Sequence, residues 1–239
     1  MSAGVVTLDE VLGKDAGFVQ ARTPAQLAWR RFRTSRLALL GVVMLTIIVL
    51  LSALAPWIAP HGQNEIDLFN IKASPSREYL LGTDALGRDV FSRLLYGGRM
   101  SLAIGVAAAL ICAVVGILFG AIAGYYGGWV DGAIMRFVDL MLAFPSIFLL
   151  LIIAAMFEGI SAWGVIFFLG LFSWMWLTRI IRGEFLSLKK REFVEAARSI
   201  GTPDAQIIRR HLLPNVVGVI VVTFTLDVAL FMLAEAGLS

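Results

Sequence analysis

The stretch SLAIGVAAALICAVVGILFGAIAGYY, residues 101–126, contains no charged side chain and decides the fold. It lies within a charge-free run over residues 100–130. An α-helix needs about 20 apolar residues to cross the hydrocarbon core of a membrane. Strands with open edges and loops cannot sit in lipid, because their backbone amides would have no hydrogen-bond partner. We therefore predict a membrane-spanning helix over residues 99–126.

The rest of the chain has the same character. Apolar residues make up 59% of the sequence and charged residues 15%, with a mean hydropathy of +0.86, whereas soluble domains are about half apolar and about a quarter charged. The length of the apolar runs argues against a large soluble helical protein. We predict an all-α, polytopic transmembrane bundle with five membrane helices, over residues 37–59, 99–126, 137–157 (with Pro145 inside it), 160–179 and 214–238.

Basic residues predict the topology. Lys and Arg cluster before the first apolar run and again between residues 179 and 210, so the positive-inside rule places both segments in the cytoplasm. We expect a cytoplasmic tail (1–36, with a basic amphipathic helix over 24–36), a first helix with an external segment (37–98, with a short helix over 90–96), and a core domain (99–239, with a cytoplasmic loop at about 180–213). Beside membrane helices, the basic clusters are topology signals, and no nucleic-acid partner is expected.

The cytoplasmic loop is predicted to form a helix, a sharp turn and a second helix. Over residues 191–200, the apolar side chains recur at helical spacing and are expected to share one face; they are Phe193, Val194, Ala196, Ala197 and Ile200. Gly201 stands where a left-handed residue ends a helix. Thr202 is expected to cap the next helix, with Pro203 at its first position and Asp204 in its first turn. Spacing alone leaves open whether the first helix packs on its own bundle or docks a partner.

Small residues predict a close helix contact. Gly116, Gly120 and Gly124 recur every four residues, which places them on one face of the second membrane helix. Cys112 lies in the same run without metal-ligating neighbours and is interpreted as a small core residue. The sequence contains no Gly-x4-Gly-Lys-Ser/Thr phosphate loop and no nucleophile or metal-ligand motif. A membrane enzyme or sensor is therefore disfavoured, and we expect no catalytic, cofactor or metal residues.

Several motifs together carry a resemblance. Glu195-Ala196-Ala197, then Gly201, then Leu213-Pro214 resembles the loop signature of ABC-importer permeases, although His211 stands where that family has isoleucine. Further matches to the dipeptide, oligopeptide and nickel branch are Leu81-Gly82-Thr83-Asp84, Gly87-Arg88-Asp89-Val90, Tyr125-Tyr126-Gly127-Gly128, Met135-Arg136-Phe137-Val138-Asp139, Ala143-Phe144-Pro145, His211-Leu212-Leu213-Pro214-Asn215 and Glu235-Ala236-Gly237-Leu238-Ser239. Over about residues 35–239, the chain resembles the "C" member of that permease pair.

The resemblance implies a type I ABC importer permease fold in the inner membrane. It implies a path for dipeptides or oligopeptides formed with a homologous permease, two ABC ATPase subunits that bind ATP and Mg, and an external substrate-binding protein. Nickel, glutathione or another small solute remain alternatives. The ATPase-docking residues it implies are Phe193, Glu195, Ala196, Ala197, Ile200, Gly201 and Pro203. A secondary carrier is disfavoured by this loop and by the lack of inverted repeats.

Two expectations concern the last membrane helix. Asp227 is an acid at membrane depth, where ionisable groups are usually functional. It is a candidate for the translocation path, where it would meet an amine or a cation, and equally for a pair with a polar group of the partner permease.

Related permeases continue past the final Leu-Ser into a sixth helix. We therefore expect the 26.0 kDa sequence to represent a truncated or partial form.

Overall fold

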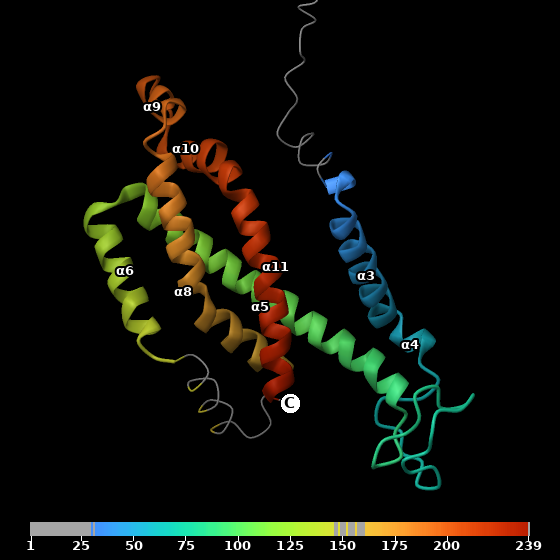
Figure 1. Cartoon of the computed structure of the whole chain (residues 1–239). Helices are drawn as coiled ribbons and strands as arrows, with labels where there is room; N and C mark the ends of the chain where they lie inside the picture. Colours follow the sequence, from blue (N-terminus) through green and yellow to red (C-terminus); the bar gives the residue numbers. More distant parts are fainter. Residues whose placement is uncertain are drawn as a thin grey trace, which may run out of the picture. The chain divides into compact units, whose positions relative to one another are not determined.

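A computed structural model describes residues 30, 32–145, 148, 152, 156 and 161–238 of the chain (Figure 1). Within these residues the fold is all-helical, and the only extended pairing is an isolated bridge between Thr83 and Asp89. The elements are α3 (Arg36–Ala53), α4 (Ala55–Ile58), α5 (Val90–Tyr126), α6 (Gly128–Leu142), α8 (Ala162–Leu188), α9 (Glu192–Ser199), α10 (Asp204–Ile207), the π-helical turn η1 (Ile208–Leu212) and α11 (Leu213–Leu238).

Four helical segments are long and apolar enough to cross a membrane: Arg36–Ala53, Val90–Tyr126, Trp163–Leu188 and Asp204–Gly237. They correspond to four of the five predicted membrane helices. The remaining one was predicted over 137–157, and most of its second half lies outside the described residues. Residues 24–29 and 31 of the predicted tail helix also lie outside the described residues.

The described part of the chain divides into two units, with the boundary between residues 50 and 51. Most of α3 belongs to the first unit. It has a mean hydropathy of 2.4 over its span and no one-sided apolar stripe, the pattern of a helix surrounded by apolar material. The predicted helix over 37–59 is interrupted at Leu54, where α3 gives way to α4, and Pro56 lies in the first turn of α4.

Helix α5 corrects the predicted start of the second membrane helix. It is continuous from Val90 to Tyr126, so residues 90–96 are not a separate helix. Asp89 caps its N-terminus by accepting a hydrogen bond from Ser92 N at 2.9 Å. Gly97 and Gly98 do not interrupt it, because one glycine costs a helix only about 1 kcal/mol. With 37 residues, α5 exceeds the thickness of the hydrocarbon core, so part of it extends beyond that core.

Two further boundaries differ from the predictions. Gly127 and Gly128 both have positive φ angles, 68° and 54°, and turn the chain directly from α5 into α6. Helix α6 ends at Leu142, so Pro145 follows the helix and does not lie inside it. This agrees with the bias of a residue before proline away from helical conformation. Helix α8 continues to Leu188, so the predicted loop over 180–213 begins as helix.

Helix α5 packs along α8, and the glycine face mediates that contact (Figure 1). A Cβ atom on Gly116 would lie 2.9 Å from Leu177 Cβ, and one on Gly120 would lie 2.7 Å from Ile181 Cβ. On Gly124 it would lie 2.5 Å from Phe185 Cβ and 2.8 Å from the Arg182 carbonyl oxygen. All three glycines therefore sit where the two helices approach too closely for any side chain.

Ion pairs join α6 to α8. Arg182 Nη2 donates to Asp131 Oδ2 at 2.6 Å, and Arg179 pairs with Asp139. Each basic residue is contributed by α8 and each acid by α6. The pairs fix the rotation of the short amphipathic α6 against the longer helix.

The segment between α4 and α5 is ordered by carboxylates. Asp84 Oδ1 accepts hydrogen bonds from Leu86 N and Arg88 N, and Asp84 Oδ2 pairs with the guanidinium groups of Arg88 and Arg93. The backbone hydrogen bond from Arg88 is the largest cause that lowers the pKa of Asp84 well below its usual value of 3.8. Hydrogen bonds from Asn70, Phe69 and Tyr79 lower the pKa of Asp67 in the same direction.

These lowered pKa values predict a pH dependence. A carboxyl group whose pKa is lower in the folded state stabilises the fold above its unfolded pKa, near 3.8 for Asp84, and that contribution is lost as pH falls toward the folded pKa. We expect amide exchange protection at Leu86 and Arg88 to be constant from pH 7 to about 5 and to decline below about 4. In Asp84→Asn, protection should be lower at neutral pH and nearly independent of pH. An acid decline as steep in Asp84→Asn as in the wild type would contradict this assignment.

Candidate functional site

Helix α9, Gly201 and α10 form one compact unit at one end of the helical core (Figure 1). Gly201 N donates to Arg198 O at 2.9 Å and Thr202 N donates to Ala197 O at 3.1 Å, the paired hydrogen bonds of a Schellman motif. Gly201 has a φ of +78°, and a Cβ atom there would meet nothing within 4 Å. Backbone conformation, and not lack of space, therefore requires the glycine.

The start of the next helix differs by one residue from the prediction. Pro203, not Thr202, occupies the N-cap position of α10, and no side chain caps it. Gln206 N and Ile207 N donate to Pro203 O at 2.9 and 3.0 Å. Asp204 lies in the first turn, as predicted, where a carboxylate favours the helix dipole. Through η1 this helix continues into α11, whose second residue is Pro214.

The five apolar residues of the predicted helix over 191–200 do not share one face; four lie in α9 and Ile200 is its C-cap. Val194 and Ala197 are buried and belong to a cluster with Ile207 and Leu212. Phe193 is 41% exposed and Ile200 is 83% exposed, and Ala196 and Glu195 are also exposed. At about 100° per residue, a helix this short can place 194 and 197 inward and 193, 196 and 200 outward. The inward face packs on the chain's own bundle, and the outward side chains leave apolar area exposed.

Tyr125 connects this unit to the membrane helices, and sequence analysis did not single it out as a functional residue. It lies at the end of α5 and is 5% exposed. Its hydroxyl donates to Asp204 Oδ1 at 2.5 Å, and the Arg198 guanidinium lies 5.3 Å from its ring centroid. Lys189 Nζ donates to its carbonyl oxygen at 3.3 Å. The tyrosine in the Tyr125-Tyr126-Gly127-Gly128 motif was the available signal.

Removal of the Tyr125 hydroxyl tests this connection. Tyr125→Phe keeps the ring beneath Arg198 but leaves Asp204 without its donor, so we expect a loss of about 1.5–3 kcal/mol in local stability. Amide exchange over residues 192–207 should accelerate, while the exchange of α8 amides stays unchanged. In a double-mutant cycle, Asp204→Asn should add little to Tyr125→Phe. Fully additive effects would show that the two side chains do not act together.

Asp227 lies on α11 beside a cavity of about 390 Å³. The Cys112 thiol donates to Asp227 Oδ2 at 3.7 Å, and Cys112 itself is 1% exposed. Apart from Asp227 and Ser173, the lining is apolar and rich in aromatic and sulfur-containing side chains: Met141, Leu142, Phe144, Pro145, Phe172, Met175, Trp176, Leu230 and Phe231. The cavity therefore combines one acidic group with an apolar wall. Within the described residues, no group of three or more His, Cys, Asp or Glu side chains could hold a metal ion.

Comparisons with known proteins identify the family. The model of the binding-protein-dependent transport system inner membrane component matches residues 116–239, which include the glycine face, α9, Gly201 and Asp227. The chain belongs to this family. A second model, the N-terminal transmembrane domain of oligopeptide transport permease C, matches residues 23–75 of this permease. The chain is thus a multi-pass inner-membrane permease.

Individual relatives agree with this assignment. The permease is 42% identical to the glutathione transport system permease protein GsiD of Escherichia coli over 222 residues, which cover 92% of this chain and 73% of the relative. It is 38% identical to the oligopeptide transport system permease protein OppC of Haemophilus influenzae over 223 residues, 92% of this chain and 71% of the relative. Both relatives are permeases of transport systems, as the loop signature indicated.

Proposed function

We propose that this permease forms a translocation path together with a homologous permease subunit and receives mechanical work from two ABC ATPases at α9. The observation that carries the proposal is the two-sided character of α9. Val194 and Ala197 anchor it to the bundle, while Phe193 and Ile200 present apolar area outward. Exposed apolar anchors on a short rigid element are suited to insertion into a groove of a partner.

The residues of the predicted docking set then have separate roles. Phe193, Ala196 and Ile200 provide the contact face, and Glu195 provides an exposed charge for a basic group of the ATPase. Ala197 is 5% exposed and holds α9 against the bundle. Gly201 and Pro203 set the angle between α9 and α10. Because Tyr125 joins α9 and α10 to the end of α5, a displacement of α9 is transmitted to a helix that crosses the membrane.

The chemistry is divided between subunits in this proposal. The ATPases bind ATP and Mg and hydrolyse the nucleotide, and the permease has no catalytic role or cofactor of its own. The N-terminus lies in the cytoplasm together with α9, and the segment between α4 and α5 faces the opposite side. An external binding protein delivers solute to that side.

Dipeptides or oligopeptides are the proposed substrates, and glutathione, nickel or another small solute are the alternatives. The relatives named for oligopeptide and glutathione transport support a peptide-like solute. The cavity beside Asp227 offers a carboxylate among aromatic walls, an arrangement that suits an ammonium group attached to an apolar body. A pair between Asp227 and a polar group of the partner permease would use the same carboxylate.

Asp227→Asn distinguishes these two roles. If Asp227 meets the substrate amine, the variant should assemble normally, and transport of a free peptide should fall roughly tenfold or more while an N-acetylated peptide is little affected. If Asp227 pairs with the partner permease, assembly should weaken and both substrates should be affected equally. Unchanged transport of both peptides would exclude both roles.

Reconstitution tests the proposed function. The permease, its homologous partner, the ATPases and the binding protein are placed in lipid vesicles, and uptake of a tripeptide, of glutathione and of Ni²⁺ is measured with and without ATP. We expect ATP-dependent uptake of a peptide-like solute, abolished by omission of this permease. Uptake that proceeds without ATPases, driven by an ion gradient alone, would overturn the proposal.

A further inference from the structure

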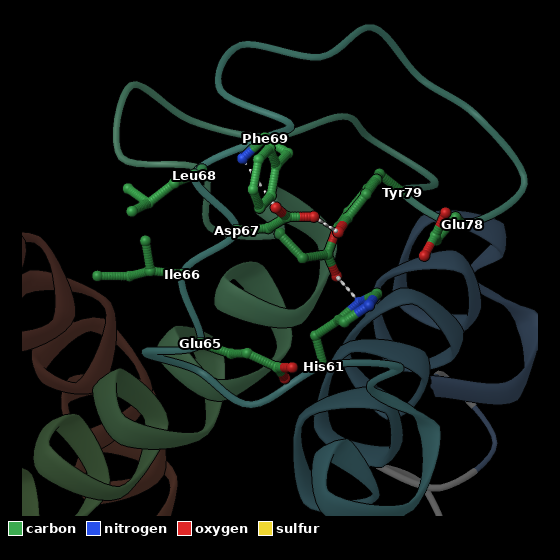
Figure 2. A pocket seen from close by; sticks show the side chains of 10 residues that line it. His61, Glu65, Ile66, Asp67, Leu68, Phe69, Glu78 and Tyr79 are labelled. Carbon is green, nitrogen blue, oxygen red and sulfur yellow. Dashed lines mark hydrogen bonds and ion pairs between the residues drawn. The ribbon is translucent and has the colours of Figure 1, made fainter.

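A pocket of about 440 Å³ lies in the segment that precedes α5, on the opposite side of the bundle from α9 in the proposed topology (Figure 2). Its lining includes four carboxylates and one imidazole: Glu65, Asp67, Glu78, Asp89 and His61. No lysine or arginine lines it. The pocket is therefore negatively charged at neutral pH.

Asp89 is an unusual member of this lining because it is buried and only half satisfied. Its side chain is 1% exposed. Oδ2 accepts hydrogen bonds from Ser92 N at 2.9 Å and from Ser92 Oγ at 2.6 Å, whereas the buried Oδ1 has no partner. His61 Nδ1, 3.8 Å from Asp89 Oδ2, also lacks a hydrogen bond. A buried carboxylate oxygen without a donor is costly, so a donor is expected to occupy the site.

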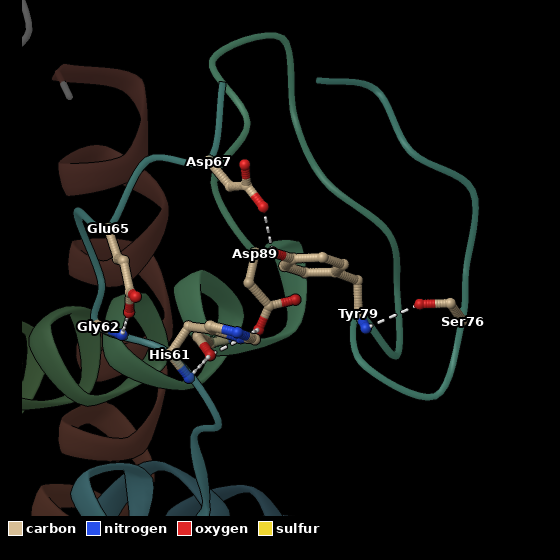
Figure 3. A network of polar contacts seen from close by, with 8 residues as sticks. His61, Gly62, Glu65, Asp67, Ser76, Tyr79 and Asp89 are labelled. Atoms are coloured by element: carbon tan, nitrogen blue, oxygen red, sulfur yellow. Dashed lines mark hydrogen bonds and ion pairs between the residues drawn. The ribbon is translucent and has the colours of Figure 1, made fainter. Parts of the chain in front are cut away.

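The other acids of the pocket are held by neutral donors only. Tyr79 Oη donates to Asp67 Oδ2 at 2.9 Å, and Gly62 N donates to Glu65 Oε2 at 2.8 Å (Figure 3). Within the described part of the chain, neither they nor Glu78 form an ion pair with lysine or arginine. Asp84, outside the pocket, pairs with the guanidinium groups of Arg88 and Arg93. Within the described residues, the acids of the pocket are thus paired with no lysine or arginine, and His61 is the basic side chain among them.

We propose that this pocket binds the ammonium or guanidinium group of a lysine or arginine side chain presented by a polypeptide partner. Such groups are cationic and carry only donors, which matches a set of free acceptors. The Tyr79 ring, stacked on His61 with centroids 4.9 Å apart, adds an aromatic wall. The volume is sufficient for one long side chain.

Two features favour a polypeptide over a free amino acid or peptide. A zwitterionic solute would bring a carboxylate, for which the lining offers no lysine or arginine. Beside the acids, the lining also has exposed apolar side chains, with Leu68 72% and Phe69 99% exposed. Apolar contacts around a buried charged anchor are typical of protein interfaces. This inference rests on the proposed function in one respect only: the proposed topology places the pocket outside the cytoplasm, so its partner is an extracytoplasmic protein.

The two histidines of the chain provide a direct probe. Purified full-length permease is labelled with ¹³C at histidine Cε1, and His211→Gln assigns the His61 signal. The labelled protein is titrated with N-acetyl-lysine methylamide and N-acetyl-arginine methylamide. Neutral N-acetyl-norleucine methylamide, the zwitterion dialanine and Mg²⁺ serve as comparison ligands.

We expect both cationic probes to shift the His61 signal saturably, while the three comparison ligands do not. Asp89→Asn should weaken binding roughly tenfold or more. Asparagine keeps an oxygen that can accept from Ser92, so the cap of α5 should persist. Glu78→Gln, on an exposed side chain, should weaken binding less than Asp89→Asn and serves as a second variant if Asp89→Asn alters the resting His61 signal.

Three results would overturn the proposal: shifts with the neutral analogue equal to those with the cations, no saturable shift with either cation, or full binding by both variants. If dialanine binds equally well, the ligand is not specifically a side chain. If Mg²⁺ binds equally well, the ligand is not specifically a nitrogen cation. The titration requires neither ATPase nor transport. A failed titration therefore leaves the proposed function untouched, and failed reconstitution leaves a positive titration standing.

Discussion

Gly124→Leu is expected to separate α5 from α8 and to lower the stability of the folded permease strongly. A Cβ atom at this position would lie 2.5 Å from Phe185 Cβ and 2.8 Å from the Arg182 carbonyl oxygen. The second neighbour is backbone and cannot rotate away. Overpacking typically costs about 1–3 kcal/mol, and a whole leucine pressed against backbone is expected to exceed that range. The free energy of unfolding in detergent micelles measures the effect.

Gly97→Leu is the matched control, because Gly97 lies on the same helix and a Cβ atom there meets nothing within 4 Å. Leucine is the better helix former, so this variant should be as stable as the wild type or slightly more stable. Gly116→Leu and Gly120→Leu should resemble Gly124→Leu, because they occupy the same face of α5. Equal stability of Gly124→Leu and Gly97→Leu would show that α5 and α8 do not pack as described.

Gly201→Val is expected to leave the permease inserted in the membrane but to abolish ATPase association and transport. At a φ of +78°, a β-branched residue is strongly disfavoured, while the space around the position is open. The turn must therefore adopt another conformation, and the outward face of α9 changes direction. Co-purification of the ATPases with tagged permease and ATP-dependent uptake measure the two losses.

Gly201→Asn separates backbone conformation from side-chain bulk. Asparagine adopts the left-handed region more readily than other residues with a side chain, so this variant should retain much of the ATPase association. Gly183→Val, at a helical glycine of α8 with open space around it, controls for the added apolar volume. Wild-type transport by Gly201→Val would remove the turn from the coupling mechanism.

Composition and local pattern were sufficient for much of this fold. The long apolar runs predicted the helical class, and the spacing of glycines predicted the close face of α5. Helix ends were less predictable. The start of α5 depends on a cap at Asp89 that lies within a polar turn. The end of α5 at Tyr126 agrees with the prediction, but α6 begins at Gly128 and not near residue 137, and it ends at Leu142 before Pro145.

The candidate site shows where local pattern is insufficient. Sequence placed the turn at Gly201 correctly, because the need for a positive φ is a local property. It could not divide the apolar residues of α9 between two faces. Val194 is buried because it packs in a cluster with residues of α10 and η1, and the spacing of residues within α9 does not reveal that packing. The role of Tyr125 was missed because it depends on a long-range contact: Asp204, which accepts its hydrogen bond, is 79 residues away in the sequence.

The most direct test of the account is a photo-crosslink from the outward face of α9. A benzophenone side chain is placed at Ile200, which is 83% exposed, in the assembled importer, and a second is placed at Val222 of α11, which is 61% exposed. We predict that illumination joins Ile200 to an ATPase subunit and does not join Val222 to one. Crosslinks from Ile200 only to lipid or to its own chain, while the ATPases remain bound, would contradict the account.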